Sequence, residues 1–191
     1  MEDRQGNRGR IVIAASQVAG TYFLPQKLLS FTEAYSDIKV DIQTRTDDEI
    51  EKLVQTGAVD IGLTLKFPEN HLFFRITEFS RDRFIGIQTT APIRKQTLLI
   101  PKDCYFMFNR DSELDIIKMN SIEAVKHFVK EGMGYGVILE SAAKLKLVHG
   151  ELDYWSGYTP QDAIANVITR PAERLSNSIW YFLNHIRKYT R

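Results

Sequence analysis

The start of the chain alternates between short apolar runs and longer stretches in which apolar residues recur at helical spacing. Ile11–Ala15 is a continuous apolar run, as expected for a strand buried on both faces. Ile38–Ile42 alternates apolar and polar residues, which predicts a second strand. Between them lies one helical face, formed by Leu24, Leu28, Phe31 and Tyr35. A strand, helix and strand this close together predict a parallel pair with a right-handed crossover.

A second helix and a third strand complete this βαβαβ unit. Thr46 and Glu49 have the spacing of a capping box, in which each side chain accepts a hydrogen bond from the other residue's backbone amide. We expect the helix to end at Gly57, because glycine readily adopts the left-handed conformation that follows many helices. The apolar run Ala58–Leu65 is the third strand.

Further along, the apolar runs become shorter and less regular. Two strands, Leu72–Glu78 and Phe84–Gln88, are expected on either side of the polar segment Ser80–Arg83. The other expected strands are Leu98–Ile100, Cys104–Phe108, Asp115–Met119, Gly134–Leu139, Leu152–Trp155 and Ala163–Thr169. Three helices are expected in this part of the chain. The first begins at Asn120, ends at Gly132 and has an apolar face formed by Ile122, Val125, Phe128 and Val129. The second is Ser141–Leu147, and the third follows Pro171, with an apolar face formed by Leu175, Ile179, Phe182 and Ile186.

This order of elements predicts an α/β fold with two Rossmann-like lobes joined by two crossing segments. Residues 10–83 and 156–191 are assigned to lobe I, with the final helix packed on it, and residues 84–155 to a shortened lobe II. The natural place for a ligand in such a fold is the cleft between the lobes.

Composition narrows the possible functions. The formal net charge is +1, which gives no basic surface of the kind that binds nucleic acid. No apolar run approaches the roughly 18 residues of a membrane span, so no membrane partner is expected. Cys104 is the only cysteine, so an internal disulfide is impossible, and we expect a buried, inert thiol and a cytoplasmic protein.

The residue types that catalysis requires are not arranged in a recognisable motif. The four histidines lack metal-ligand spacing, and the sequence holds neither a nucleophile elbow nor a phosphate loop. The glycines at 132, 134 and 136 lie after a helix and before a strand, the reverse of a dinucleotide fingerprint, so they are interpreted as a helix stop and a turn. The sequence therefore predicts a binding protein with no metal and no cofactor, rather than an enzyme.

Three segments resemble the effector-binding domain of LysR-type transcriptional regulators. They are Gly9–Ser16 with Phe23–Pro25, then Ile50–Leu63 with its Gly-Ala-Val-Asp, and the glycine-rich Val129–Ile138. The resemblance covers nearly the whole chain from Gly9 and implies the fold of type II periplasmic binding proteins. The chain departs from the family pattern at Thr89–Arg94 and between Ser112 and Asn120, which is why lobe II is expected to be shortened.

The resemblance also implies a function. A small, anionic metabolite would bind between the lobes and, by favouring one lobe arrangement, re-set a homodimer or higher homo-oligomer. Members of the family form head-to-tail dimers, which implies an interface at the Leu24–Tyr35 helix. They contact DNA through an N-terminal winged helix-turn-helix, which this sequence does not include. Residues 1–9 are interpreted as the remnant of the linker to that domain. A solute-binding protein of a transport system with the same fold is the alternative, and an enzyme on this fold is a more distant one.

Polar residues at the ends of the first three predicted strands are the candidate effector contacts. Ligands of such sheets lie at the carboxyl ends of the strands, against helix N-termini that attract negative charge. Each candidate also has a structural interpretation: Ser16 could simply cap its helix, and Arg45 could be a solvated arginine beside Asp47 and Asp48. The candidates in lobe I are Ser16, Gln17, Thr44, Arg45, Thr46 and Thr64.

In lobe II the candidates follow two further strands. Asn109 comes after the expected strand at Cys104–Phe108, and Asn120 and Ser121 head a helix. The resemblance implies effector contacts in both regions. Asn120 has a structural alternative as the N-cap of that helix.

Overall fold

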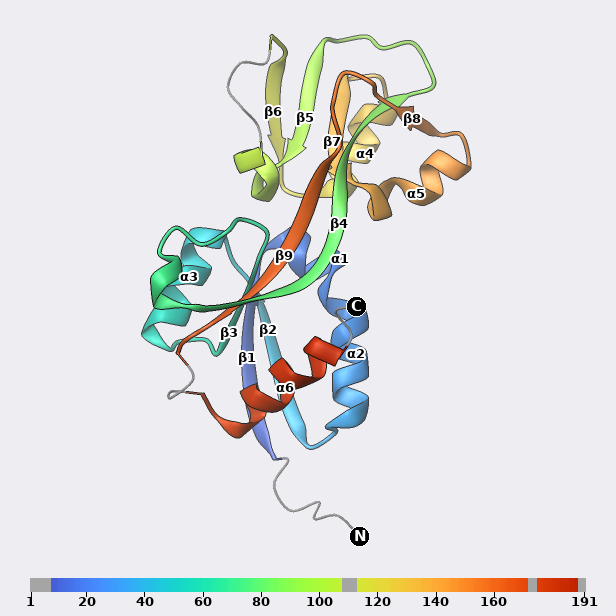
Figure 1. Ribbon diagram of the computed structural model, residues 1–191. Helices are drawn as coiled ribbons and strands as arrows, with labels where there is room; N and C mark the ends of the chain where they lie inside the picture. Colours follow the sequence, from blue (N-terminus) through green and yellow to red (C-terminus); the bar gives the residue numbers. More distant parts are fainter. Residues whose placement is uncertain (1–7, 108–112, 172–174, 189–191) are drawn as a thin grey trace. The chain divides into compact units, whose positions relative to one another are not determined.

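The computed structural model describes residues 8–107, 113–171 and 175–188, and it divides into two compact units (Figure 1). The first unit comprises Met1–Ser80 and Ala165–Arg191, and the second comprises Arg81–Ile164. Two strands, β4 (Arg75–Thr89) and β9 (Gln161–Thr169), begin in one unit and end in the other, as the expected crossing segments do. The lobe boundaries expected from the sequence, at 83/84 and 155/156, stay a prediction.

In the first unit the sheet has the strand order β2-β1-β3-β9. β1 (Gly9–Ala15) lies between β2 (Ile38–Thr44) and β3 (Ile61–Thr64) and is parallel to both. β3 is shorter than the expected strand, and Asp60, just before it, contacts β1 through both its backbone and its side chain. Asp60 N donates to the Val12 carbonyl oxygen (2.9 Å), and Val12 N donates to the Asp60 carboxylate (2.8 Å). The aspartate in the family-like segment therefore joins the two strands.

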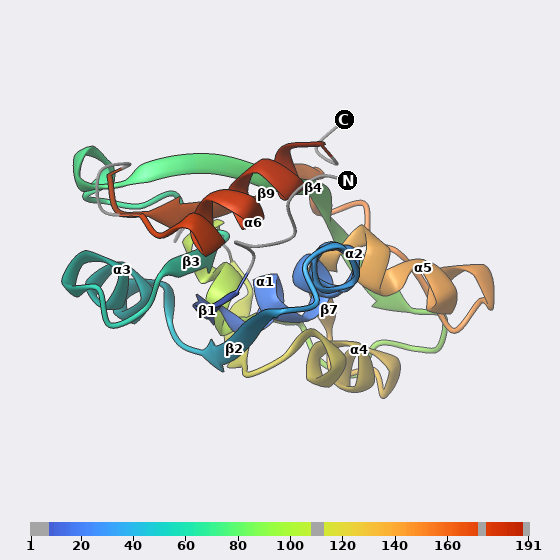
Figure 2. The same ribbon diagram turned by 90° about the horizontal axis from the view of Figure 1, so that it is seen from below.

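Helices cover both faces of these strands (Figure 1). One face carries α3 (Asp47–Thr56), whose Ile50 and Val54 are fully buried against Ala14 of β1. The other carries α2 (Leu24–Ala34) and α6 (Asn177–Lys188), which lie side by side in both views (Figures 1 and 2). Phe31 of α2 meets Phe182 of α6 edge-on, with ring centroids 5.1 Å apart. The packing of the final helix on the first lobe is thus confirmed, and burial of these apolar faces is the main stabilising term.

The predicted capping box and helix stop of α3 are both present. Thr46 Oγ1 accepts a hydrogen bond from Glu49 N (3.4 Å), and the Glu49 carboxylate accepts one from Thr46 N (2.9 Å). Gly57 follows α3 with φ 76°, the left-handed conformation that glycine adopts without steric cost. The stretch before α2 is also helical, as the six-residue α1 (Gln17–Tyr22), which the sequence did not predict as a separate helix.

In the second unit the strand order is β4-β7-β5-β6, with β8 (Leu152–Tyr154) paired to β4. β7 (Tyr135–Leu139), β5 (Thr97–Pro101) and β6 (Asp115–Met119) run parallel, and β4 is antiparallel to β7. The helices are η2 (Lys102–Met107), α4 (Ile122–Lys130) and α5 (Glu140–Val148); a further 3-10 turn, η1 (His71–Phe73), precedes β4 in the first unit.

The glycine-rich segment of the second unit has the structural role that the sequence predicted. Gly132 ends the turn after α4 with φ 81°, and Gly134 leads into β7 with φ 140°. At Gly136 an added Cβ would lie 2.9 Å from side-chain atoms of both Val125 and Val129, so this glycine lets α4 pack closely on β7.

Four expectations from the sequence were wrong. The two strands around Ser80–Arg83 are one 15-residue strand, β4, because backbone pairing does not require apolar side chains. Cys104 lies in a 3-10 helix rather than a strand, although it is fully buried as expected. Phe128 is 45% exposed, so the buried apolar residues of α4 are Ile122, Val125 and Val129. Leu175 precedes α6 instead of belonging to it.

Among the described residues, no helix is both long enough and apolar enough to cross a membrane.

Candidate functional site

The carboxyl ends of β1, β2 and β3 meet at Ala15 and Ser16, within the first unit. Ala15 lies opposite Thr44 of β2, and its carbonyl oxygen accepts a hydrogen bond from Arg45 N (3.1 Å). On the other side, Ser16 N donates to the carbonyl oxygen of Leu63 in β3 (3.1 Å). Because parallel strands end at the same edge of the sheet, residues far apart in the sequence are brought to one rim.

Ser16 lies at the centre of this rim. It is the N-cap of α1, and its side-chain oxygen accepts a hydrogen bond from Ala19 N at 3.4 Å. Its side chain is fully buried, and its hydroxyl proton remains available to a further acceptor because the bond to Ala19 uses only an oxygen lone pair. The structural interpretation of Ser16 as a helix cap is therefore correct, and it leaves the ligand role open.

Two side chains of the rim carry buried polar atoms without a hydrogen-bond partner among the described residues. Thr64, at the end of β3, is 1% exposed, and its Oγ1 has no partner. Gln17 Oε1 is also buried without a hydrogen-bond partner, whereas Gln17 Nε2 donates to Thr21 Oγ1 at 3.4 Å. A buried hydroxyl or amide oxygen left unpaired costs on the order of 1–3 kcal/mol. Unpaired buried polar atoms on this rim favour a site that a polar ligand completes.

The residues after β2 are more exposed and already partly engaged. Arg45 Nη1 donates to the carbonyl oxygen of Thr44 at 2.7 Å, which leaves the other guanidinium donors on the exposed surface. Thr46 Oγ1 both donates to the Glu49 carboxylate (2.9 Å) and accepts from Glu49 N. The hydrogen bonds from the Thr46 backbone and side chain lower the pKa of the Glu49 carboxyl below its ordinary value of 4.5. The capping box thus places a negative charge at the start of α3.

Asp47 is a rim residue that the sequence did not single out as a candidate. Its carboxylate accepts a hydrogen bond from Lys66 N at 3.3 Å, just beyond the end of β3. A residue at the first position of a helix has no sequence signal that predicts a contact to the next loop. With Glu49, it adds acidic character on the α3 side of the rim, so the Ser16–Thr64 side is the more favourable one for an anion.

The predicted residues of the second unit divide into three cases. Ser121 is the N-cap of α4, and its hydroxyl oxygen accepts a hydrogen bond from Ala124 N at 3.2 Å. Asn120 lies one position before the cap, so the structural alternative in which it caps the helix does not apply. Asn109 lies outside the described residues.

The chemistry available at the rim of the first unit is that of binding. The described residues hold no group of three or more His, Cys, Asp or Glu side chains that could bind a metal ion. Hydroxyl donors, an arginine and an amide oxygen can hold a small polar ligand, with the donors complementary to carboxylate or phosphate oxygens.

Comparison with known proteins identifies the family to which this chain belongs. The LysR substrate binding domain model matches residues 4–104. A probable RuBisCO transcriptional regulator of Gracilaria tenuistipitata var. liui is 30% identical over 82% of this chain and 59% of its own length. A second, from Emiliania huxleyi, is 26% identical over 97% of this chain and 65% of its own length. The chain thus spans 59% and 65% of the lengths of these two relatives.

The fold agrees with that of solved regulatory domains. The CcmR regulatory domain of Synechocystis PCC6803, solved in complex with 2-PG, is 19% identical, with a TM-score of 0.75 over 96% of this chain and 98% of that domain. The cofactor-binding domain of the Cbl transcriptional regulator is 18% identical, with a TM-score of 0.76 over 97% of this chain and 91% of that one. The α/β fold expected from the sequence, with its resemblance to periplasmic binding proteins, is confirmed. The chain belongs to the family of LysR substrate-binding domains.

Proposed function

We propose that this chain is the effector-sensing domain of a LysR-type transcriptional regulator and that it binds a small anionic metabolite at the rim around Ser16. The observation that carries the proposal is the pair of buried hydroxyls on adjacent strand ends. Ser16 retains a free hydroxyl proton, and Thr64 Oγ1 has no partner among the described residues. Family membership supports a binding role over a catalytic one, and regulation over transport.

The charge of the ligand follows from the donors. A hydroxyl that donates to a charged oxygen forms a stronger hydrogen bond than one that donates to a neutral oxygen. Arg45 adds an exposed cation, since only one of its guanidinium donors is engaged with a backbone carbonyl. Gln17 Oε1, an unpaired acceptor, favours a ligand that also carries a hydroxyl or a protonated oxygen. A carboxylate or phosphate with a second oxygen group fits this set.

A first experiment uses 2-PG as the probe, because a solved regulatory domain of the same fold holds it. Inorganic phosphate and a small organic cation serve as comparison ligands. The expected result is that 2-PG or phosphate raises the melting temperature of the chain while the cation does not. Stabilisation by cations alone would contradict the proposed ligand class.

The substitution Thr64→Val is expected to lower the affinity for the ligand without lowering the stability of the fold. Removing a buried hydroxyl that has no partner leaves the free energy of unfolding of the ligand-free chain unchanged or raises it, since nothing is lost and a desolvation cost disappears. The same change removes a hydrogen bond to a charged ligand, worth about 1.5–3 kcal/mol, so affinity for the anion falls about tenfold or more. Calorimetric titration and melting of the same sample measure both. A stable variant that binds as tightly as the original chain places the site elsewhere.

Ser16 needs a pair of variants, because it also caps α1. Ser16→Ala removes the hydroxyl and the cap, whereas Ser16→Gly removes the hydroxyl but keeps most of the capping stability. If the hydroxyl holds the effector, both variants lose affinity about tenfold, although only the alanine variant loses stability. Affinity loss confined to Ser16→Ala would mean that Ser16 acts through the helix alone.

We also propose that the chain forms a homodimer through α2 and the neighbouring strand β2. β2 is an edge strand of the sheet, and beside it lies a hollow of about 320 Å³ lined mainly by apolar side chains, including Leu24, Leu28 and Ile42. Ile42 is 51% exposed and Leu29 of α2 is 60% exposed. Exposed aliphatic side chains around an apolar hollow are typical of a protein interface. DNA contact, by the resemblance, belongs to a separate winged helix-turn-helix.

A further inference from the structure

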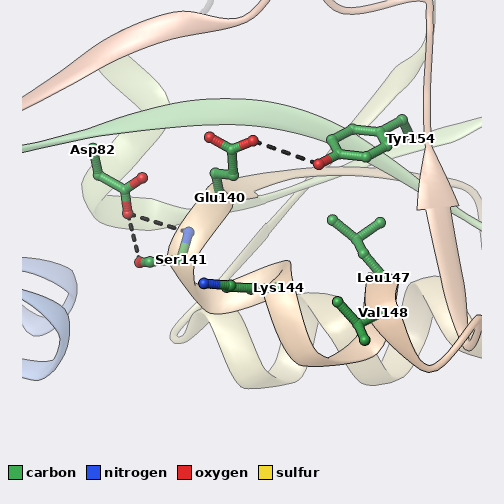
Figure 3. A pocket seen from close by; sticks show the side chains of 7 residues that line it. All are labelled: Asp82, Glu140, Ser141, Lys144, Leu147, Val148 and Tyr154. Carbon is green, nitrogen blue, oxygen red and sulfur yellow. Dashed lines mark hydrogen bonds between the residues drawn. The ribbon is translucent and has the colours of Figure 1, made fainter.

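The second unit contains a cavity of about 500 Å³ beside α5, shown in Figure 3. Three segments form its walls: the polar part of β4, helix α5, and the end of β8. Its lining residues are Asp82, Glu140, Ser141, Lys144, Leu147, Val148 and Tyr154. No sequence pattern pointed to this cavity, and all its lining residues belong to the second unit, whereas the rim around Ser16 belongs to the first.

Asp82 brings an uncompensated negative charge to the cavity. Its carboxylate accepts hydrogen bonds from Arg83 N (2.7 Å), Ser141 N (3.3 Å) and Ser141 Oγ (2.5 Å), all uncharged donors. No cation among the described residues forms an ion pair with it. The bond to Ser141 N also ties Asp82 to the start of α5, whose own N-cap, Leu139, has no side-chain hydrogen bond. The carboxylate is thus fixed in place by uncharged donors, and no described cation forms an ion pair with it.

The other acidic side chain is neutralised. The Glu140 carboxylate receives both ends of the Arg83 guanidinium, at 2.8–3.0 Å, and the Tyr154 hydroxyl lies 3.5 Å away. This bidentate pair fixes the wall between β4 and α5. Glu140 therefore adds little net charge to the cavity.

Lys144 supplies the opposite charge, one helical turn after Ser141. In the described part of the chain it has no ion-pair or hydrogen-bond partner. Side chains three positions apart on a helix lie roughly 5–6 Å from each other, so the Lys144 stem starts next to Ser141, to which Asp82 is bonded. An unpaired carboxylate and an unpaired ammonium hence line neighbouring parts of one wall.

The remaining lining is apolar. Leu147 and Val148 continue along α5 from Lys144, and the ring of Tyr154 lies across from them (Figure 3). Val148 is 73% exposed and Tyr154 is 54% exposed, so both present apolar surface to a ligand in the cavity. The carboxylate of Asp82, from β4, lies at the start of α5, and the ammonium of Lys144 and then the apolar side chains follow along the helix.

We propose that this cavity binds a free α-amino acid with an apolar side chain. The ammonium of the ligand pairs with Asp82, its carboxylate pairs with Lys144, and its side chain packs on Leu147, Val148 and Tyr154. A molecule with only one of the two charges leaves either Asp82 or Lys144 unpaired. The site is distinct from the proposed effector rim, so one can be correct without the other.

The test uses three probes of nearly the same shape: L-phenylalanine, 2-phenylethylamine and 3-phenylpropionate. NMR titration of the chain follows the backbone amides of α5 and β8 and, separately, those around Ser16. L-phenylalanine is expected to shift the α5 and β8 signals and to bind about two- to fivefold more tightly than either singly charged probe, since an exposed ion pair is worth up to about 1 kcal/mol.

Lys144→Gln provides the decisive variant, and Lys95→Gln is its control, an exposed lysine of the same unit outside the cavity. Lys144→Gln should weaken L-phenylalanine about two- to fivefold and leave 2-phenylethylamine unchanged or slightly tighter, because that probe has no carboxylate. Lys95→Gln should change neither. Three results would overturn the proposal. L-phenylalanine could leave the α5 signals unshifted at 10 mM, roughly the weakest affinity of interest. All three probes could bind equally tightly, or only the signals around Ser16 could shift.

Discussion

The buried side chain of His185 joins α6 to α2 and makes the stability of the folded chain depend on pH. It lies on α6, 7% exposed, with its Nε2 2.9 Å from Ser30 Oγ of α2. Because the Ser30 hydroxyl already donates to the Lys27 carbonyl oxygen (3.0 Å), it accepts the hydrogen bond from His185. The ring also meets Phe31 edge-on. An imidazole in these surroundings is favoured in its neutral form.

This arrangement predicts lower stability under mildly acidic conditions. Burial, followed by the charge of Lys188, lowers the pKa of His185 below its ordinary value of 6.5 in the folded chain. Between the lowered pKa and about 6.5, the unfolded chain binds a proton that the folded chain does not, so the free energy of unfolding falls as the pH falls through this window. Urea unfolding between pH 5 and pH 8 measures the effect.

The matched variant is His185→Gln, which keeps a donor for Ser30 and cannot titrate. Its unfolding free energy should depend less on pH over the same window than that of the original chain. Identical slopes in the two proteins would assign the pH dependence to other groups.

At the scale of elements, the sequence predicted best where local signals decide the structure. The capping box and Gly57 fixed both ends of α3, and the apolar periodicity located α2, α3 and α4. It failed where tertiary contacts decide. β4 continues without a break through the polar segment and pairs with β7 and β8 only from Phe84 onwards, and the continuity of such a strand leaves no trace in hydrophobicity. The apolar run at Cys104 fits a buried 3-10 turn as well as a buried strand.

Substitution of Gly134 and of Gly150 by alanine distinguishes the energetic cost of backbone strain from that of steric overlap. Both have positive φ, 140° and 67°. A Cβ on Gly134 would lie 2.1 Å from the carbonyl oxygen of Thr97, whereas a Cβ on Gly150 would meet nothing within 4 Å. Gly150→Ala should therefore cost about 1 kcal/mol, from the backbone conformation alone. Gly134→Ala should cost about 3 kcal/mol or more, because the strands β5 and β7 must move apart. Denaturant unfolding compares the two, and equal losses would contradict the close approach.

At the scale of the whole molecule, the candidate sites differ in how far they could be predicted. Ser16 and Thr64 follow predicted parallel strands, so topology alone brings them to one rim. The cavity beside α5 could not be predicted, because Asp82, Lys144 and Tyr154 come from three segments whose register depends on the folded sheet. Their residue types, taken singly, are those of any exposed surface.

Phe31 and Tyr35, on the helix at which the family resemblance implies an interface, pack inside the first unit. Phe31 is fully buried against Phe182, and Tyr35 stacks on Tyr181 with ring centroids 5.3 Å apart, so both stabilise the α2–α6 contact inside one unit. The apolar groups left for a partner are aliphatic: Leu28, Leu29 and Ile42. The proposed dimer therefore depends on these residues and not on the aromatic ones.

Ile42→Glu tests the proposed interface with little effect on folding, since the side chain is already half exposed at an edge strand. Leu72→Glu is the control, an 88% exposed residue of the same unit outside the hollow. Sedimentation at high micromolar concentration should show the original chain and Leu72→Glu as dimers and Ile42→Glu as a monomer, because a charge buried in an interface without a partner costs several kcal/mol. A monomeric original chain contradicts dimerisation under these conditions, and a dimeric Ile42→Glu places the interface on another surface.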